Sequence, residues 1–393
     1  MTYQQIPTSP AARRIFLPSL LLFAAMPAEA TCRELAEHLD VGAEYAVDLL
    51  RNVSGGLGHG DSGIGELEIV AEVDGGIIGW EGAGLTVAAQ YHHGRSLSEW
   101  YVGDVQGVSN LEATHGLYIA EAFLSFPVIG DSITAMAGLI DVNGIFDARP
   151  DGNLFLNSSQ EMGPDFSQSG FDGPSLTPLT SMGAVVQFNA PSWTASLGVF
   201  DEPEVDPSRP DRRPIRMPGE GKVLVIGQID YELLPDVTWA VGAWRYSGRF
   251  DALLSTDPTA RRHGHGIYTM LQTSREPDGD EGVWNGWIRL GWANEGVHPI
   301  QYYAGSGVHY TWGQNQLGMA IAHARSGKAA RAQASLDSLL FEKAETSMEV
   351  TFAHTLLDKL TLQPALQYIV NPGWDASLNN ALVVGMRVRL SIL

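Results

Sequence analysis

The sequence predicts an all-β fold, a transmembrane antiparallel up-and-down β-barrel of about 16 strands with an inward-folded long loop between strands 5 and 6. Three observations predict it. Segments of about ten residues alternate apolar and polar positions along nearly the whole chain. Short and long connections take turns between these segments. Aromatic residues stand toward both ends of the apolar stripes, as at the two edges of a bilayer.

Composition narrows the function classes. The chain has 393 residues, of which only 18% are charged, and its formal net charge is −21. Nucleic acid is a poor partner for such a chain, because phosphate binding needs a surface of Lys and Arg. After the N-terminus, no apolar stretch is long enough for a membrane-spanning helix.

Residues 1–30 read as an export signal. Arg13 and Arg14 precede an apolar run over 15–26, and Ala28-Glu29-Ala30 forms a small-x-small cleavage site, so the mature chain is expected to begin near Thr31. The run RRIFL also resembles a twin-arginine signal. That route carries folded cargo, which suits a membrane barrel badly, and the general secretory route is preferred.

We expect the barrel to span residues 43–393 and a short periplasmic segment, residues 31–42, to precede it. Within TCRELAEHLD, Leu35 and Leu39 stand at i, i+4 and predict an amphipathic helix, either a periplasmic cap or a frayed leader. Cys32 is the only cysteine, so no intrachain disulfide can form. Lipidation of Cys32 is disfavoured because Glu29-Ala30-Thr31 lacks the usual aliphatic and small residues.

The alternating segments define the strands in order. They centre on 43–50, 65–74, 84–93, 116–127, 132–141, 180–190, 192–200, 221–232, 236–246, 264–274, 283–293, 300–312, 315–325, 345–355, 359–370 and 381–392. In VWNGWIRLGW, Trp284 and Trp292 share the apolar face eight residues apart. At a tilt of about 40° that spacing covers roughly 20 Å, close to the distance between two aromatic girdles. A soluble sandwich also alternates, but it has less reason to place aromatics at the ends of each stripe.

The connections supply an independent test. Pro191 almost alone separates strands six and seven, and Gly313-Gln314 joins twelve to thirteen, whereas long gaps fall at 94–115, 142–179, 201–220 and 326–344. Short turns on one side and long loops on the other are typical of outer-membrane barrels. The gap over 142–179 is long enough to suggest a function.

Several runs resemble the carbohydrate-selective porins of the OprB family. The most specific are LFLNSS at the start of 154–170 (LFLNSSQEMGPDFSQSG) and QYIVNPG at the end of 362–373. The other matching runs are NVSGGL at 52–57, GELEIVAEVDGGIIGWEGAG at 65–84, AGLIDVNGIFD at 137–147 and SLGVFD at 196–201. The resemblance implies a sixteen-stranded sugar-diffusion barrel in the outer membrane of a Gram-negative bacterium. The chain departs from the usual pattern by ending in Leu393 rather than an aromatic residue, which bears on recognition by the assembly machinery.

The interior of a barrel of this size holds water and must be polar. Projection of the alternation places the following residues there: Glu44, Asp48, Glu66, Glu68, Glu72, Asp74, Glu121, Gln187, Gln228, Asp230, Arg289, Glu345, Glu349, Gln363, Gln367, Arg387 and Arg389. Since the last strand closes against the first, Arg387 and Arg389 are expected to pair with Glu44 and Asp48, and also to set a transverse field.

The loop over 142–179 is the candidate constriction. Its polar residues can satisfy sugar hydroxyls, and they are Asp147, Arg149, Asp151, Asn153, Asn157, Gln160, Glu161, Asp165 and Gln168. Its aromatic residues, Phe146, Phe155, Phe166 and Phe171, can cover sugar ring faces, although Phe155 and Phe166 suit loop anchoring better. Asp and Asn in such loops also commonly fix turns rather than touch solute.

Signals for an enzyme or a cofactor are weak. No G-x-S-x-G or H-E-x-x-H motif occurs, and His263-Gly264-His265 offers two histidines without a third metal ligand. We therefore expect no enzyme, no cofactor and no metal, and passive diffusion of small glucose-type sugars. The alternatives are a general or differently selective porin and a barrel-borne hydrolase. Expected partners are sugars, outer-membrane lipid and the assembly machinery, with a homotrimer left open.

Overall fold

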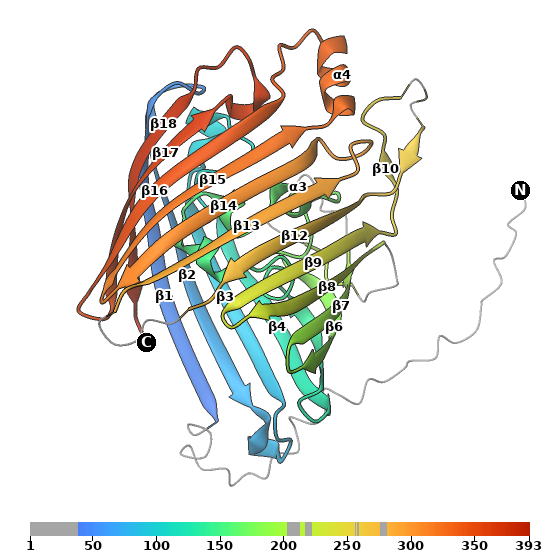
Figure 1. Cartoon of the computed structure of the whole chain (residues 1–393), viewed down its shortest axis with the longest axis vertical. Coiled ribbons are helices and arrows are strands. Elements are labelled where there is room, and N and C mark those ends of the chain that lie inside the picture. Colours follow the sequence, from blue (N-terminus) through green and yellow to red (C-terminus); the bar gives the residue numbers. More distant parts are fainter. Residues whose placement is uncertain (1–37, 203–212, 217–221, 256, 258, 276–280) are drawn as a thin grey trace, which may run out of the picture.

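The computed structural model describes residues 38–202, 213–216, 222–255, 257, 259–275 and 281–393. The predicted export signal and residues 31–37 lie outside this part of the chain. Within it, sixteen antiparallel strands form one closed barrel (Figure 1). No helix among the described residues is long and apolar enough to cross a membrane.

The barrel strands follow one another around the wall in chain order. They are β1 (Leu39–Ser54), β2 (Gly60–Asp74), β3 (Gly84–Gly94), β4 (Gly116–Ile129), β5 (Ile133–Ile140), β6 (Ser181–Ala190), β7 (Trp193–Asp201), β8 (Val223–Leu234), β9 (Val237–Tyr246), β12 (His265–Thr273), β13 (Val283–Ala293), β14 (Ile300–Trp312), β15 (Asn315–Ser326), β16 (Ala344–Leu356), β17 (Leu360–Val370) and β18 (Ala381–Ser391). Two short strands, β10 (Phe250–Asp251) and β11 (Arg261–Arg262), pair with each other in the connection between β9 and β12.

Short helical segments occupy the connections. They are η3 (Gly75–Ile78), η4 (Ser98–Val102), η5 (Pro150–Leu154), α2 (Ser158–Glu161), α3 (Pro164–Ser167), α4 (Lys328–Leu336) and η6 (Pro372–Trp374). The longest connections leave one end of the barrel, where α4 stands in Figure 1, and most connections at the other end are turns of two or three residues. The exceptions are 75–83 and 274–282, which are longer than 55–59 and 294–299 at the α4 end. This separation confirms the predicted alternation of short and long connections.

All sixteen predicted strand segments are strands. The largest differences are at β1, which begins at Leu39 instead of 43, and at β2, which begins at Gly60 instead of 65. These two strands pair with each other from Leu39 opposite Val73 to Asn52 opposite Gly60. Residues 39–42, expected in the segment before the barrel, therefore belong to β1, because the alternation of apolar with polar or small residues continues back to Leu39. The helix predicted within 31–40 is accordingly wrong at its last two residues, which are strand.

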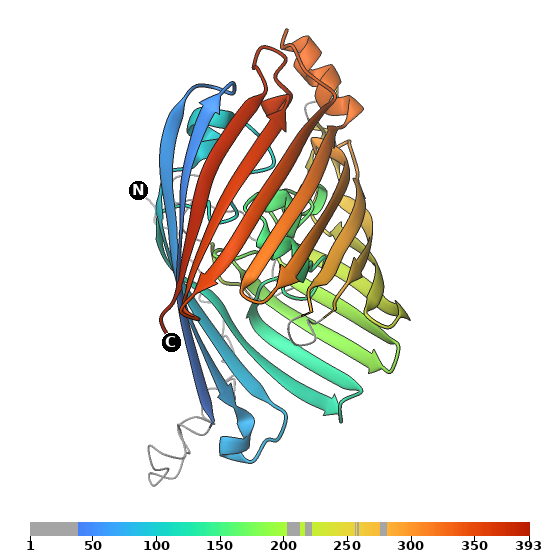
Figure 2. The ribbon, with the colours of Figure 1, turned by 60° about the vertical axis from the view of Figure 1, so that its left-hand side comes forward.

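The barrel separates its side chains into two faces. Aliphatic and aromatic side chains point outward and are exposed, for example Leu49, Ile119, Ile288 and Met319. The intervening positions point inward and carry the buried polar side chains, among them Gln228, Arg289, Glu345, Glu349, Gln363 and Gln367. Figure 2 shows the short helices of the β5–β6 connection, in green, surrounded by the strands.

Closure of the barrel joins β1 to β18, with Asp48 opposite Arg387. The Arg387 guanidinium donates from Nε to Asp48 Oδ1 and from Nη2 to Asp48 Oδ2, both at 2.6 Å. Neither side chain is exposed to solvent. Arg389 lies 4.0 Å from Glu44, and both of these side chains are partly exposed. Both arginines thus face acids of β1 as predicted, but only the pair of Asp48 and Arg387 is buried.

Breaking the buried pair should destabilise the barrel. Asp48→Ala leaves the Arg387 charge buried without its counter-charge, and we expect a loss of about 3–5 kcal/mol in unfolding free energy. Urea unfolding in detergent, followed by the heat-modifiable shift in gel mobility, measures this loss. Glu44→Ala is the matched control on the same strand, with an expected effect of about 0–1 kcal/mol because its partner is distant and solvated. Equal effects of the two substitutions would contradict this assignment.

Candidate functional site

The connection over 141–180 packs against inward-facing side chains of distant strands. Its contacts reach Gln228 on β8, Arg289 on β13, His309 on β14 and Glu349 on β16. The helices η5, α2 and α3 lie in this connection, and Figure 1 shows α3 behind β13 and β14. Hydrogen bonds of this kind hold the segment at defined positions along the inner wall.

Arg289 is the central anchor of the segment. Its Nε donates to Asp147 Oδ1 at 3.1 Å and its Nη2 to Asp147 Oδ2 at 2.8 Å, while Nη1 donates to Asp165. All three side chains are buried. One strand cation therefore binds two loop carboxylates, and such charge-assisted, bidentate contacts fix both position and orientation.

Two glycines make room for this anchor. A Cβ at Gly163 would overlap the Arg289 guanidinium, and a Cβ at Gly291 would overlap the carboxylate of Asp165 and the guanidinium. Gly291 follows Arg289 on the same inward face of β13. The absence of two side chains thus lets the loop approach the wall closely.

Arg149 stabilises the next turn of the segment. Its guanidinium lies 4.7 Å from the ring centroid of Trp287 and 5.9 Å from that of Tyr303. Its Nε donates to the Glu161 carbonyl at 3.1 Å. A planar guanidinium can stack on aromatic faces while its edge donates hydrogen bonds, so Arg149 joins the loop backbone to the aromatic inner wall.

Two glutamates of β16 accept hydrogen bonds from backbone N–H groups of the loops. Glu349 accepts from Leu156 N at 2.8 Å and from Asn157 N at 2.9 Å. Glu345 accepts from Val105 N at 2.9 Å and from Gln106 N at 3.1 Å. One inward face of a single strand thus holds both the 141–180 connection and the 95–115 connection.

The two connections also bind each other. Asn110 N donates to the Leu156 carbonyl at 2.7 Å, and Ser158 N donates to the Gly107 carbonyl at 3.0 Å. The Asn110 amide donates from Nδ2 to Glu161 at 2.9 Å and accepts at Oδ1 from Arg387 at 2.7 Å. The pair of connections is consequently one hydrogen-bonded body that reaches from β18 to β13.

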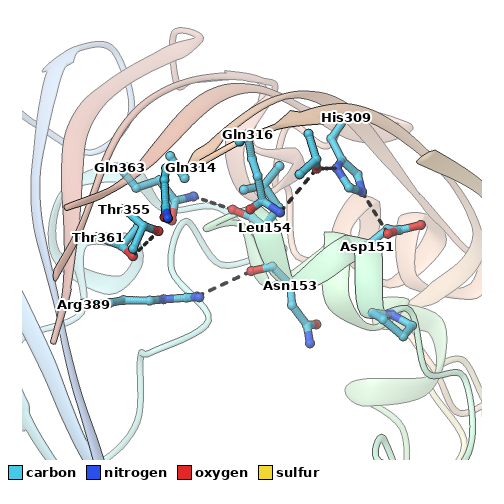
Figure 3. Close-up of a pocket in the computed structure, with 14 residues that line it drawn as sticks. Asp151, Asn153, Leu154, His309, Gln314, Gln316, Thr355, Thr361, Gln363 and Arg389 are labelled. Atoms are coloured by element: carbon cyan, nitrogen blue, oxygen red, sulfur yellow. Dashed lines mark hydrogen bonds and ion pairs between the residues drawn. The ribbon is translucent and has the colours of Figure 1, made fainter. Parts of the chain in front are cut away.

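A polar hollow of about 370 Å³ lies on the short-turn side of this body. We call it the lower hollow, and it is lined by Pro150, Asp151, Asn153, Leu154, His309, Thr311, Gly313, Gln314, Gln316, Ala353, Thr355, Thr361, Gln363 and Arg389. Figure 3 shows Arg389 reaching toward Asn153 from the wall, and His309 bonded to Asp151. The distances are 3.5 Å to the Asn153 carbonyl and 2.8 Å between His309 Nε2 and Asp151 Oδ1.

A second hollow, of about 420 Å³, lies on the long-loop side. We call it the upper hollow, and it is lined by Asp104, Val105, Gln106, Gly107, Ser109, Asn110, Glu112, Asp141, Asn143, Ser158, Glu161, Met162, Ser167, Gln168, Leu176 and Thr177. Four of these are acidic and none is Lys or Arg. Burial raises the pKa of Asp104 to about 6, and it raises the pKa of both Glu112 and Asp141 to about 7.

The predicted loop residues divide into two groups. The first group lines a hollow: Asp151 and Asn153 line the lower hollow, and Glu161 and Gln168 line the upper hollow. Those that are buried within the loop and its anchors are Asp147, Arg149, Asn157, Gln160 and Asp165. The predicted wall residues Arg289, Glu345, Glu349 and Arg387 are buried and bind the loops. Three further wall glutamates have other partners. Glu66 lies beside His92, Glu68 accepts a hydrogen bond from Gln90, and Glu121 accepts one from the backbone amide of Asp141.

The aromatic residues of the segment do not line either hollow. Phe166 stacks on Trp244 and Tyr268, with centroids 5.3 and 6.2 Å apart. Phe146 packs edge-on against Phe200, and Phe155 is buried in a cluster with Ala320 and Ala353. Phe171 contacts Phe250 instead. These rings anchor the loop, as expected for Phe155 and Phe166.

Sequence reasoning missed several lining residues. In the lower hollow they are His309, Thr311, Gln314, Gln316, Thr355 and Thr361, and in the upper hollow Asp104, Asn110, Glu112, Asp141 and Asn143. The missed residues of the lower hollow that lie on strands β14 to β17 could have been found from the alternation, because they stand at inward-facing positions. No pattern marks the second group, whose positions depend on how two connections fold against each other.

Comparison with known proteins agrees with this architecture. The family model described as carbohydrate-selective porin, OprB family, matches residues 59–391. No curated protein matches the chain. A structure titled as the high pH structure of Pseudomonas putida OprB has a TM-score of 0.82 at 17% identity, covering 92% of this chain and 96% of that one.

Two further solved structures share the fold more loosely. The low pH structure of Pseudomonas putida OprB has a TM-score of 0.57 at 13% identity, covering 92% of this chain and 94% of that one. A mutant of Rh. blastica porin has a TM-score of 0.50 at 12% identity, covering 90% of this chain and 100% of that one. At such identities the likeness shows the fold alone, whereas the family model covers most of the chain. The chain belongs to the OprB family of carbohydrate-selective porins, which are channels of the outer membrane.

Proposed function

We propose that small, glucose-type sugars diffuse passively through this barrel and that the 141–180 connection forms the constriction they pass. The observation that carries the proposal is the attachment of this connection to β8, β13, β14 and β16, with a polar hollow on either side. A segment held across a water-filled barrel reduces its cross-section. Selectivity then depends on the groups that line the remaining path.

The lower hollow has the chemistry that a neutral polyol requires. The amide of Gln316 and the hydroxyls of Thr355 and Thr361 offer both donors and acceptors. Arg389 and Asp151 add one charge of each sign. A sugar gains about 1 kcal/mol net per hydrogen bond, so a few such bonds give binding weak enough for release.

The finer points of location and assembly are part of the same proposal. The chain is exported through the secretory route, cleaved near Thr31, and inserted by the assembly machinery into the outer membrane of a Gram-negative bacterium. Association into homotrimers stays a prediction, as does the expectation that the channel performs no covalent chemistry. The short turns, the start of β1 and the end of β18 face the periplasm in this orientation.

Sugar selectivity is tested in reconstituted vesicles. Glucose should enter faster than gluconate, which is of similar size but charged. Arg289→Met removes the anchor of Asp147 and Asp165 and should weaken attachment of the loop by about 3–5 kcal/mol, so that the variant admits both solutes at similar rates. Equal entry of both solutes into wild-type vesicles would instead identify a general porin. An unchanged preference in Arg289→Met would show that the anchored loop does not select.

Weak sugar binding is tested by block of ion conductance. Gln316→Leu or Thr361→Val removes one hydrogen-bonding group from the lower hollow and should raise the half-blocking glucose concentration about fivefold, as expected for about 1 kcal/mol. Thr346→Val is the matched control, because Thr346 bonds His323 on the outer face at 2.8 Å. If the half-blocking glucose concentration is the same for all three variants, the lower hollow takes no part in sugar binding.

Ion selectivity should depend on pH. Since the pKa values of Asp104, Glu112 and Asp141 are raised to about 6 or 7, these carboxyls are charged at pH 8 and neutral at pH 5. The upper hollow loses negative charge on acidification, so the preference for cations, measured as a reversal potential across a salt gradient, should fall. Asp141→Asn should reproduce part of that fall at pH 8. A constant reversal potential between the two pH values would contradict a conducting path through the upper hollow.

A further inference from the structure

The outer face of the barrel carries a continuous row of cationic and aromatic side chains. Arg245 on β9 lies opposite His265 on β12, and the His265 ring contacts Trp292 on β13 with centroids 5.6 Å apart. Trp292 lies opposite Tyr302 on β14, and Tyr302 lies opposite Arg325 on β15. We call these five residues the outer row. It crosses five adjacent strands without interruption.

The outer row lies where the apolar surface ends. Each of its members stands within three residues of the long-loop end of its strand, the end that carries α4 in Figure 1. Toward the short-turn end, the same outer face continues with Ile267, Leu290 and Ile321, which are exposed aliphatic side chains. Tryptophan and tyrosine are enriched at such borders between hydrocarbon and water.

Neither arginine of the row has an acidic partner among the described residues. Arg245 and Arg325 are exposed, and within the described part of the chain neither forms an ion pair or a hydrogen bond through its side chain. Arg51 differs, although it too is an outer-face arginine near the long-loop end. It donates to Asp61 on the neighbouring strand at 3.1 Å. The part of the barrel that the structure describes therefore pairs one outward arginine with an acid and leaves the two of the outer row without one.

We propose that the outer row binds the phosphate-bearing headgroup of a lipid in the membrane leaflet on the long-loop side. An arginine near the membrane surface attracts the anionic groups of lipid headgroups, and its planar fork matches phosphate oxygens. Two such arginines flank aromatic rings that can cover the apolar part of a headgroup. The inference rests on the membrane location of the family and not on sugar transport.

The connection above the row extends the cationic surface. Arg249 lies in the turn after β9, and Arg261 and Arg262 form β11. Asp251 is paired with Arg261 at 2.9 Å and so is not available to the outer row. In a chain with a net charge of −21, this gathering of cations at one rim favours an anionic partner there.

A second copy of the chain fits the outer row less well. A two-fold contact places the same patch on both partners, so that each arginine meets a member of a row that contains no acidic residue. The described residues of the row supply no carboxylate to answer them. A lipid phosphate brings the missing negative charge.

The proposal is tested by retention of bisphosphorylated lipid A on the intact, detergent-solubilised barrel, measured by native mass spectrometry. Wild type should retain the lipid. The double variant Arg245→Gln, Arg325→Gln should retain about tenfold less, as the loss of two charge-assisted contacts implies. Arg51→Gln is the matched control and should retain as much as wild type. Dephosphorylated lipid A should not be retained by any of the three proteins.

Several outcomes would overturn the assignment. Equal retention in the double variant, or equal retention of the dephosphorylated lipid, would show that apolar contacts suffice. Loss of a wild-type oligomer in the double variant would mean that a second copy covers the row. Heat-modifiable mobility and glucose entry should be unchanged in all variants, since the substituted side chains face outward. A failure of sugar selectivity in wild type would leave this test intact.

Discussion

Burial of charge inside a closed barrel is the constraint on which the rest of the structure depends. Arg289 and Arg387 are both fully buried, and an isolated charge in such a place costs several kcal/mol. Arg387 is satisfied by Asp48 across the closing strand pair and by Asn110, whereas Arg289 is satisfied by Asp147 and Asp165. The requirement for partners draws two connections against the wall. The interior is thereby divided into an upper and a lower hollow.

Buried carboxylates complete the same arrangement. Glu345 and Glu349 stand on one inward face of β16 and accept backbone amides from the two connections. Loop backbone has no strand neighbour to pair with, so its amides need such acceptors when they leave water. The wall thus serves as a template for the loops. The groups left over, chiefly neutral amides and hydroxyls, line the lower hollow and remain available to a solute.

The outward face follows a different rule because its solvent is hydrocarbon. Aliphatic side chains cover its middle, and aromatic and cationic ones gather at the long-loop end. Arg51 with Asp61 shows how an outward cation is neutralised by the protein itself. Arg245 and Arg325 are exposed on the same face, and the partner proposed for them is a lipid phosphate. The same barrel wall therefore lines the channel with its inner face and contacts lipid with its outer face.

Alternation along the chain by itself determined the sixteen strands and their two faces, because side-chain direction has a period of two residues whatever the neighbours are. It also placed Arg387 and Arg389 beside Glu44 and Asp48, since an even strand count closes the last strand on the first. Only the tertiary structure decided which loop residues line a hollow. Asp147 and Asp165 form buried ion pairs with Arg289, whereas Asp151 and Asn153 line the lower hollow. Loops lack a periodic pattern, and their long-range partners lie more than a hundred residues away, so no local signal records this division.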